Sequence, residues 1–329
     1  MAGLLVYLAF RGANLGDIGR AMLQVNYLWF IPLIAVTLAS HVVRAYRWQL
    51  LLDVIDSPEQ RTLLRTAFSA LMIGYMVNYA LPRIGEVVRT LHVSAKERLS
   101  FAGVLGTVVI ERVMDVITLL VGLALTSVIL IDRSNDFLVT LLSPLGGTLS
   151  WTLYLVVIFA LLGGVITAIV LKNPNSSLRR YWKRHGQPAW AAFRKGIATA
   201  HRSPHRLMLV ATTVVMWLLY VLMAYIPLIM LGMTGPYDLS FLDGMVIMFI
   251  GAIGVALPLP GGIGSFHYIT RVSLVEIYGI TPSLAVTYAV FVHGCQLILY
   301  VTIGLLAIIL EKSSLGQLYT QAKAARRDC

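Results

Sequence analysis

Long apolar segments follow one another along this chain, and they constrain its fold more than any other feature. Because 58% of the residues are hydrophobic and only 12% are charged, the chain has more apolar surface than a soluble core could hide. Segments of at least about 18 apolar residues can cross a bilayer as helices. We expect such spans at roughly 26–52, 104–131, 149–171, 207–233 and 283–310. The sequence therefore predicts an all-α, multi-pass integral membrane protein.

Residues 1–10 are also apolar, but as a helix they would cover only about 15 Å, half of a bilayer core. They lack the basic start and the small-residue cleavage site of a signal peptide. We expect them to be the end of a first span, which gives about six full spans in all.

Two similar breaks interrupt the apolar pattern. The first reads ALPRIGE at 80–86, the second reads ALPLPGGIG at 256–264, and shorter apolar segments at about 64–81 and 241–258 run into them. Proline and glycine end helices. In a membrane protein, broken helices at matching places in two halves point to a substrate site between them. We therefore expect a transport path.

A basic segment sets the orientation. Residues 172–206 contain nine Lys or Arg and no Asp or Glu, which places this linker in the cytoplasm by the positive-inside rule. Trp182, Trp190 and Phe193 lie among the basic residues and indicate an amphipathic helix on the inner leaflet. Anionic lipid is the expected partner of this linker, and we expect no nucleic acid.

With this linker inside, 64–100 must begin and end in the cytoplasm, and 238–282 must begin and end outside. One re-entrant helical hairpin in each half satisfies both conditions, because a non-helical turn is tolerated where protein or water surrounds it. The expected fold is an inverted repeat of transmembrane helices in the cell inner (cytoplasmic) membrane, with two opposed re-entrant hairpins and both termini in the cytoplasm. Its expected parts are a first half at 1–171, the linker at 172–206, a second half at 207–311 and a tail at 312–329.

Six charged residues lie within or beside the apolar runs of the first half: Arg83, Glu86, Arg89, Glu111, Arg112 and Asp115. At about 2.5 to 3.5 kcal/mol for each charge at mid-bilayer, exposure to lipid would cost roughly 15 to 20 kcal/mol, more than most folds can lose. We expect these side chains to face the protein interior and to pair. Those of Arg83, Glu86 and Arg89 are spaced to pair along one side of a helix.

Two interpretations of these charges remain. They bind substrate, which we favour for Arg83, Glu86 and Arg112, because a guanidinium matches two phosphate oxygens. Alternatively, they form ion pairs that hold the hairpin in place or lie at the cytoplasmic rim, a position that suits Arg89 and Glu111 equally well.

The matching places of the second half are neutral or weakly basic. Gly261 and Gly262 allow a backbone to approach a ligand or another helix, and both interpretations stay open. The amides of a helix that starts near Ser265 would face an anion. His267 and His293 have no third ligand at metal spacing, so we expect them to be buried or to contact substrate, with no metal and no cofactor. Ser265 and His267 are two residues apart and point to different sides of a helix, so we expect no enzyme.

Four motifs resemble one known family. They are Arg44 with Arg47-Trp48, the run NYALPRIGEVVR at 78–89, Glu111-Arg112 with Asp115, and LPLPGGIGSF at 257–266. Together they cover nearly the whole chain and look like the lysylphosphatidylglycerol synthase transmembrane, or flippase-like, family. Asn78, which opens the second motif, joins the candidate substrate-binding residues.

The resemblance implies a lipid flippase with re-entrant helices. The family includes the membrane half of the multiple peptide resistance factor, which moves aminoacylated phosphatidylglycerol across the membrane. This chain departs from it at His267, where members often carry Glu, and it lacks the soluble aminoacyl-transferase domain of the fused members. The resemblance therefore implies lipid transport without lipid synthesis, and it leaves the aminoacyl headgroup open.

The expected function is translocation of an anionic or aminoacylated phospholipid, or of a lipid-linked headgroup, between leaflets. The phosphate would meet Arg83, Arg89 or Arg112 in a central cavity. The alternative is a secondary transporter of a small anionic solute, which a closed protein wall around the cavity would favour. No nucleotide-binding motif occurs, so we expect passive scrambling or an ion gradient. The small-residue patches at 122–124 and 163–164 permit packing into a homo-oligomer.

Overall fold

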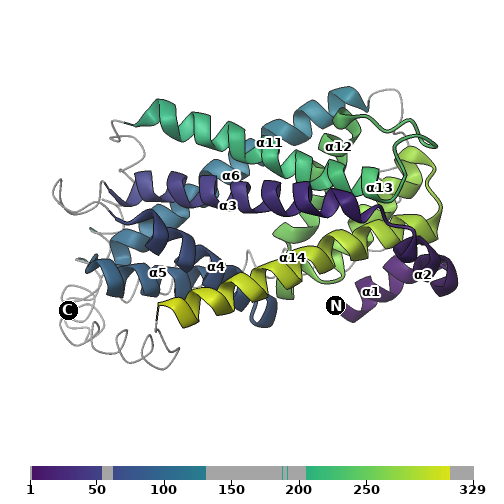
Figure 1. Cartoon of the computed structure of the whole chain (residues 1–329). Coiled ribbons are helices and arrows are strands. Elements are labelled where there is room, and N and C mark those ends of the chain that lie inside the picture. Colours follow the sequence, from purple (N-terminus) through teal and green to yellow (C-terminus); the bar gives the residue numbers. More distant parts are fainter. Residues whose placement is uncertain (1, 54–61, 131–186, 188–190, 192–204, 312–329) are drawn as a thin grey trace, which may run out of the picture.

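The computed structural model describes residues 2–53, 62–130, 187, 191 and 205–311 (Figure 1). All regular structure in this part of the chain is helical, as expected. The predicted span at 149–171, most of the basic linker with its amphipathic helix, and the tail at 312–329 lie outside the described residues.

Two series of helices match each other element by element. In the first half they are α3 (Phe30–Leu52), α4 (Leu64–Ala80), α5 (Ile84–Glu97) and α6 (Phe101–Ile129), with 23, 17, 14 and 29 residues. In the second half they are α11 (Arg206–Met230), α12 (Phe241–Ala256), α13 (Ser265–Tyr278) and α14 (Pro282–Leu310), with 25, 16, 14 and 29 residues. The helices predicted on either side of each break are therefore present.

Three stretches of the described chain are long and apolar enough to cross a membrane: Tyr27–Leu52, Arg206–Met230 and Pro282–Leu310. They correspond to three of the predicted spans. The fourth long helix, α6, has the length of α14 but carries Glu111, Arg112 and Asp115 near its middle. At about 1.5 Å per residue, both 29-residue helices exceed the roughly 30 Å of a bilayer core.

Two short helices precede these series. The first, α1 (Ala2–Phe10), has nine residues, packs against α13 and is too short to cross a membrane. The second, α2 (Leu15–Leu23), packs against α14. The side chain of Asn14 caps α2 by accepting a hydrogen bond from the Gly16 amide at 2.8 Å.

Local sequence signals fix several helix ends. Ser100 caps α6 through the amide of Gly103, and Ser240 forms a capping box with Asp243 at the start of α12. Gly279 ends α13 with a φ of 64°, the left-handed conformation that glycine adopts without a steric penalty. Pro282 then opens α14, where its missing amide proton costs nothing.

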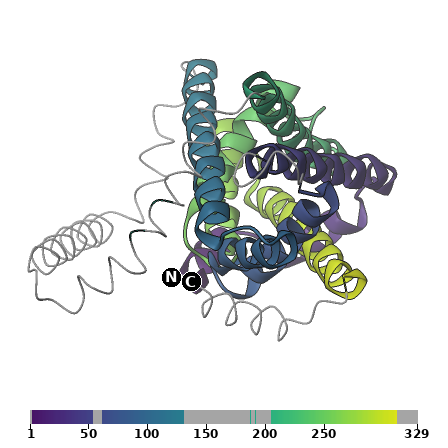
Figure 2. The ribbon, with the colours of Figure 1, turned by 90° about the vertical axis from the view of Figure 1, so that its left-hand side faces the viewer.

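The two halves pack as counterparts of each other. Helices α3 and α11 run antiparallel, because Ser40 contacts Met223 while Arg47 bonds to Thr213. Helix α4 packs against α14, and α12 packs against α6. Seen from the end where α5 lies, α6 (teal) and α14 (yellow) flank the α4–α5 pair (Figure 2). Exchange of the two series leaves this set of helix contacts unchanged.

Glycine makes both short hairpins tight. A Cβ on Gly85 would lie 2.0 Å from the carbonyl oxygen of Gly74, so the backbones of α4 and α5 nearly touch. A Cβ on Gly254 would lie 2.7 Å from the Cα of Phe266, and α12 and α13 are equally close. The hairpins lie toward opposite ends of the bundle (Figure 1), and Tyr79 of one packs against Gly261 of the other.

Candidate functional site

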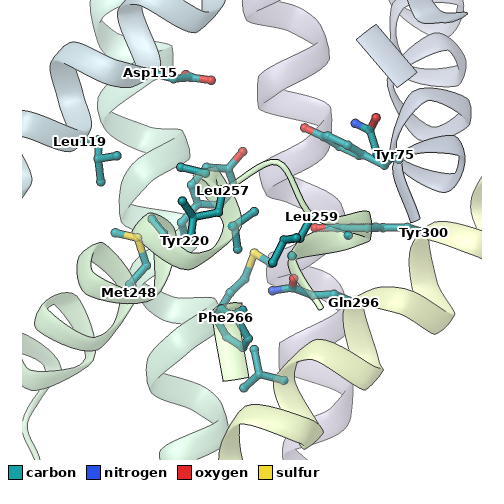
Figure 3. Close-up of a pocket in the computed structure, with 18 of the residues that line it drawn as sticks. Tyr75, Asp115, Leu119, Tyr220, Met248, Leu257, Leu259, Phe266, Gln296 and Tyr300 are labelled. Atoms are coloured by element: carbon teal, nitrogen blue, oxygen red, sulfur yellow. The ribbon is translucent and has the colours of Figure 1, made fainter. Parts of the chain in front are cut away.

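A cavity of about 610 Å³ lies where the two hairpin tips meet. Both tips line it, together with side chains from α3, α6, α11 and α14. Tyr75 and Tyr300 lie on one side of the cavity and Asp115 and Leu119 on another (Figure 3). Of the twelve candidate residues, seven line this cavity: Asn78, Arg83, Glu86, Arg112, Asp115, Gly261 and Gly262.

A cluster of buried ion pairs forms one wall of the cavity and supports that wall from behind. Arg44 of α3 lies 2.5 Å from a Glu111 oxygen and 2.6 Å from an Asp115 oxygen. Arg47, one turn further on, lies 2.6 Å from the other Asp115 oxygen. Arg89 of α5 lies 2.8 Å from the second Glu111 oxygen. We call these five residues the charge cluster. It ties α3, α5 and α6 together.

The charge cluster confirms that Arg89, Glu111 and Asp115 face inward and pair. Glu111 is 0% exposed and Arg89 is 2% exposed, so neither lies at a water-exposed rim. Removing one partner from a buried ion pair typically costs about 3 to 5 kcal/mol, because the other charge stays buried and uncompensated. Loss of any one member should therefore destabilise the whole cluster.

The pairing runs between helices, and the predicted pairing along α5 is wrong. Arg83 precedes the helix in a left-handed conformation, with φ 66° and ψ −7°, and leaves the face that Glu86 and Arg89 share. Glu86 instead pairs with Arg112 of α6 at 2.6 Å. The proline and glycine of the break thus turn Arg83 away from its sequence neighbours.

The Glu86–Arg112 pair is the exposed part of this network. Arg112 is 37% exposed at its side chain and Glu86 is 16% exposed. Asp115 lies 3.7 Å from Arg112 as a second carboxylate. Asn78 supports the pair by donating to Glu86 at 3.4 Å and accepting the Gly85 amide at 2.8 Å.

Arg83 is the cavity arginine that has no ion pair among the described residues. Its guanidinium donates a hydrogen bond to the backbone oxygen of Ala256 in the other hairpin. Left-handed backbone costs a residue with a Cβ about 1 to 2 kcal/mol, and the other tip uses glycine for it, with φ 56° at Gly261 and 76° at Gly262. The first tip thus keeps an arginine where glycine would fit better. Among the described residues that line the cavity there are three arginines, Arg44, Arg83 and Arg112, and two carboxylates, Glu86 and Asp115, so the lining itself carries one surplus positive charge.

The other candidates of the second half hold its tip together. Ser265 is fully buried and donates to the Gly254 oxygen at 2.6 Å and the Gly262 oxygen at 3.2 Å. His293 lies 2.9 Å from the Gly261 oxygen, and its ring centroid is 4.8 Å from that of His267. These three side chains, like Arg89 and Glu111, do not line the cavity.

The amide of Gly264, just ahead of α13, donates a hydrogen bond to the His267 ring at 3.4 Å. This amide therefore already has a partner within the protein. No three His, Cys, Asp or Glu side chains gather as metal ligands in the part of the chain that the structure describes.

Sequence reasoning missed an aromatic wall on the side of the cavity away from Asp115, which we call the tyrosine wall. The Tyr75 and Tyr300 rings stack with centroids 5.1 Å apart, and Tyr79 lies 6.1 Å from Tyr300. The guanidinium of Arg44 lies 5.9 Å from the Tyr75 ring, a cation–π distance. Tyr75 and Tyr79 are four residues apart on α4 and so share a face. That spacing was the available signal.

Comparison with known proteins gives one result. The family model described as Lysylphosphatidylglycerol synthase TM region matches residues 1–304. No curated protein and no solved structure matched the chain.

Proposed function

The chain belongs to the lysylphosphatidylglycerol synthase TM family, and from this premise we propose that it moves a phospholipid or lipid-linked headgroup between leaflets through the central cavity. Arg83 carries the proposal. It is a strained, unpaired arginine that faces a cavity of about 610 Å³, within the size range of about 300 to 1,000 Å³ usual for ligand sites. A phosphate would supply the anion that this guanidinium lacks.

The remaining arginines are arranged to assist Arg83. Arg44 and Arg112 also line the cavity, and the carboxylates of Glu111, Asp115 and Glu86 hold them in place. A phosphate at Arg83 would therefore meet a preorganised positive wall. A cationic group on the same headgroup would find Glu86 and the tyrosine wall. An anionic or aminoacylated lipid fits both features.

Two re-entrant hairpins, α4–α5 and α12–α13, would give the headgroup its path. Their helices have 14 to 17 residues, or about 21 to 26 Å, less than a bilayer core. The matching helix series support an inverted repeat, and rocking of one half against the other would expose the cavity to each side in turn. When a headgroup arrives, the phosphate would take Arg83 from the Ala256 oxygen and separate the tips.

The basic linker sets the proposed orientation in the inner membrane. Helix α11 begins at Arg206, the last residue of this linker, so its start would lie in the cytoplasm. Because α3 is antiparallel to α11, the end of α3 with Arg44 and Arg47 lies toward the cytoplasm. Helix α14 ends beside Lys96 of α5 through Glu311, so the end of α14 would lie on that side too. The cytoplasmic positions of the tail at 312–329 and of the N-terminus stay predictions.

Transport in liposomes tests the proposal. The full chain would be reconstituted with trace phosphatidylglycerol, phosphatidylethanolamine or lysylphosphatidylglycerol that carries a nitrobenzoxadiazole (NBD) fluorophore. Dithionite bleaches only outer-leaflet label, so a translocase raises the bleached fraction. We expect this rise for at least one lipid, its loss in Arg83→Ala, and its retention in Arg20→Ala, whose arginine pairs with Asp17 on exposed α2.

The same vesicles separate lipid transport from the alternative. A transporter of small anions would take up labelled glycerol phosphate or inorganic phosphate and leave the bleached fraction of every lipid unchanged. That pair of results contradicts the lipid proposal. Arg112 lines the cavity and is nevertheless 37% exposed at its side chain, which favours lipid, because a solute carrier needs a closed wall.

A further inference from the structure

A second hollow, of about 420 Å³, adjoins the central cavity. It lies along α6, and three residues, Glu86, Arg112 and Val116, line both hollows. The remaining lining is entirely apolar: Leu105, Val108, Val109, Val113 and Ile117. We call this hollow the α6 groove. The Glu86–Arg112 ion pair thus stands between an apolar groove and a charged cavity.

The α6 groove has an apolar floor with an ion pair at one edge. Its residues recur at spacings of three and four, which places them on one stripe of α6. Among the described residues the later part of this stripe is uncovered: Val113, Val116 and Ile117 are 47%, 53% and 57% exposed, whereas Val108 is 2% exposed. An amphiphile with an anionic group a few bonds away from an apolar chain matches both parts.

We propose that the α6 groove binds a fatty acyl chain of the transported lipid, and that the Glu86–Arg112 pair is the lateral entry through which the headgroup passes into the cavity. This inference rests on the proposed function and adds the place of entry. Arg112 reaches Glu86 at 2.6 Å and Asp115 at 3.7 Å. It therefore exchanges Glu86 for the lipid phosphate while Asp115 keeps it oriented.

Other occupants match the α6 groove less well. The predicted span at 149–171 has no charged residue, so it would cover the apolar stripe and offer no charged group to Glu86 or Arg112. A second copy that presented the same stripe would bring the same apolar residues and an ion pair that is already satisfied within it. A phospholipid carries a phosphate and acyl chains on one glycerol, and so offers a group for each part.

Filling the groove tests the proposal. Val113→Trp places a large ring on its floor, and Leu120→Trp places the same ring elsewhere on exposed α6, where Leu120 is 61% exposed. We expect Val113→Trp to slow NBD-lipid transport by about tenfold, the effect of roughly 1.4 kcal/mol, and Leu120→Trp to leave it unchanged. Equal rates in both variants overturn the groove but not the proposed function, which fails only if the unaltered chain moves no lipid.

Photo-crosslinking gives a readout that does not depend on transport. Benzoylphenylalanine would replace Val113 or Leu120 in the full chain, in micelles with a trace of acyl-labelled phosphatidylglycerol. We expect the label at position 113 to be displaced by excess unlabelled lipid and reduced several-fold by Arg112→Gln, with neither effect at position 120. A crosslink from 113 to a peptide of 149–171, or to a second copy, overturns the proposal.

Discussion

Arg83 of the first hairpin tip donates a hydrogen bond to the backbone oxygen of Ala256 at the end of α12. The two residues belong to opposite halves of the chain and meet at the edge of the central cavity. In the proposed function this arginine would bind either a carbonyl of the other hairpin or a phosphate, and would so couple the two tips to the ligand. Arg83 is therefore the first residue to test.

Arg83→Gly separates the role of this side chain in transport from its role in stability. Glycine adopts φ 66° without the penalty that arginine has, so we expect the variant to be as stable as the parent or up to about 1 kcal/mol more stable. Transport should be lost because the guanidinium is gone. Thermal unfolding in detergent and the NBD-lipid assay measure the two effects.

Arg98→Gly is the matched control, because Arg98 is also left-handed, with φ 54°, but ends α5 away from the cavity. It should gain similar stability and keep full transport. Normal transport by Arg83→Gly would show that the guanidinium is dispensable.

Glu111→Gln should destabilise the fold strongly. The neutral amide would leave Arg89 without its ion pair and Arg44 and Arg47 with the single carboxylate of Asp115, and breaking buried pairs costs about 3 to 5 kcal/mol. Asp17→Asn removes a carboxylate from an exposed pair on α2 and should cost at most about 1 kcal/mol. Unfolding midpoints of the two variants in one detergent compare them. Equal midpoints would mean that the charge cluster does not support the fold.

Gly85→Ala should open the first hairpin. The added methyl would lie 2.0 Å from the backbone oxygen of Gly74, and backbone cannot rotate away as a side chain can. We expect a loss of at least about 1 to 3 kcal/mol. Gly294→Ala in α14 has no atom within 4 Å of the new methyl and should gain up to about 1 kcal/mol from helix propensity. Equal unfolding midpoints for Gly85→Ala and Gly294→Ala would contradict the close packing of α4 against α5.

Acid should weaken the contact between the end of α14 and α5. Burial of Glu311 raises its pKa, but hydrogen bonds from Lys96 and Ser69 and the charge of His92 outweigh burial, and the pKa of this carboxyl is lowered below its usual 4.5. A lowered carboxyl pKa gives stability that is present above about pH 4.5 and is lost as the pH falls through the folded value. Unfolding midpoints between pH 7 and pH 3 should therefore fall more steeply in the parent than in Glu311→Gln. Parallel profiles would show that this carboxyl does not contribute.

The sequence predicts the elements of this fold better than their contacts. The apolar runs and the proline-glycine breaks locate α4 and α12 within one or two residues, because hydropathy and helix breakers act locally. The spacing of Arg83, Glu86 and Arg89 predicts the wrong partners, because the partners lie on other helices. Tyr75 and Arg44 went unrecognised as cavity residues for the same reason: which face of α3 or α4 is covered depends on neighbours distant in sequence.

The sequence likewise identifies some residues of the candidate site and misjudges others. Intramembrane charge identifies Arg83, Glu86, Arg112 and Asp115, since its cost outside a polar site is high. Ser265 and His267 have suitable chemistry but point into the packing of their own hairpin, a distinction that the sequence pattern does not contain. A polar residue near a break is therefore a site candidate only when its side chain is free to leave the hairpin.

The equal helix series of the two halves bear on the energetics of a transport cycle. If each half can take the other's arrangement, the conformation open to one side of the membrane is close to an inverted image of the conformation open to the other. Two such states are nearly isoenergetic, so little work is needed to interconvert them. In the proposed cycle their degeneracy would be broken chemically: arginine stands at one left-handed tip and glycine at the other, and the charge cluster lies on α3, α5 and α6 of the first half.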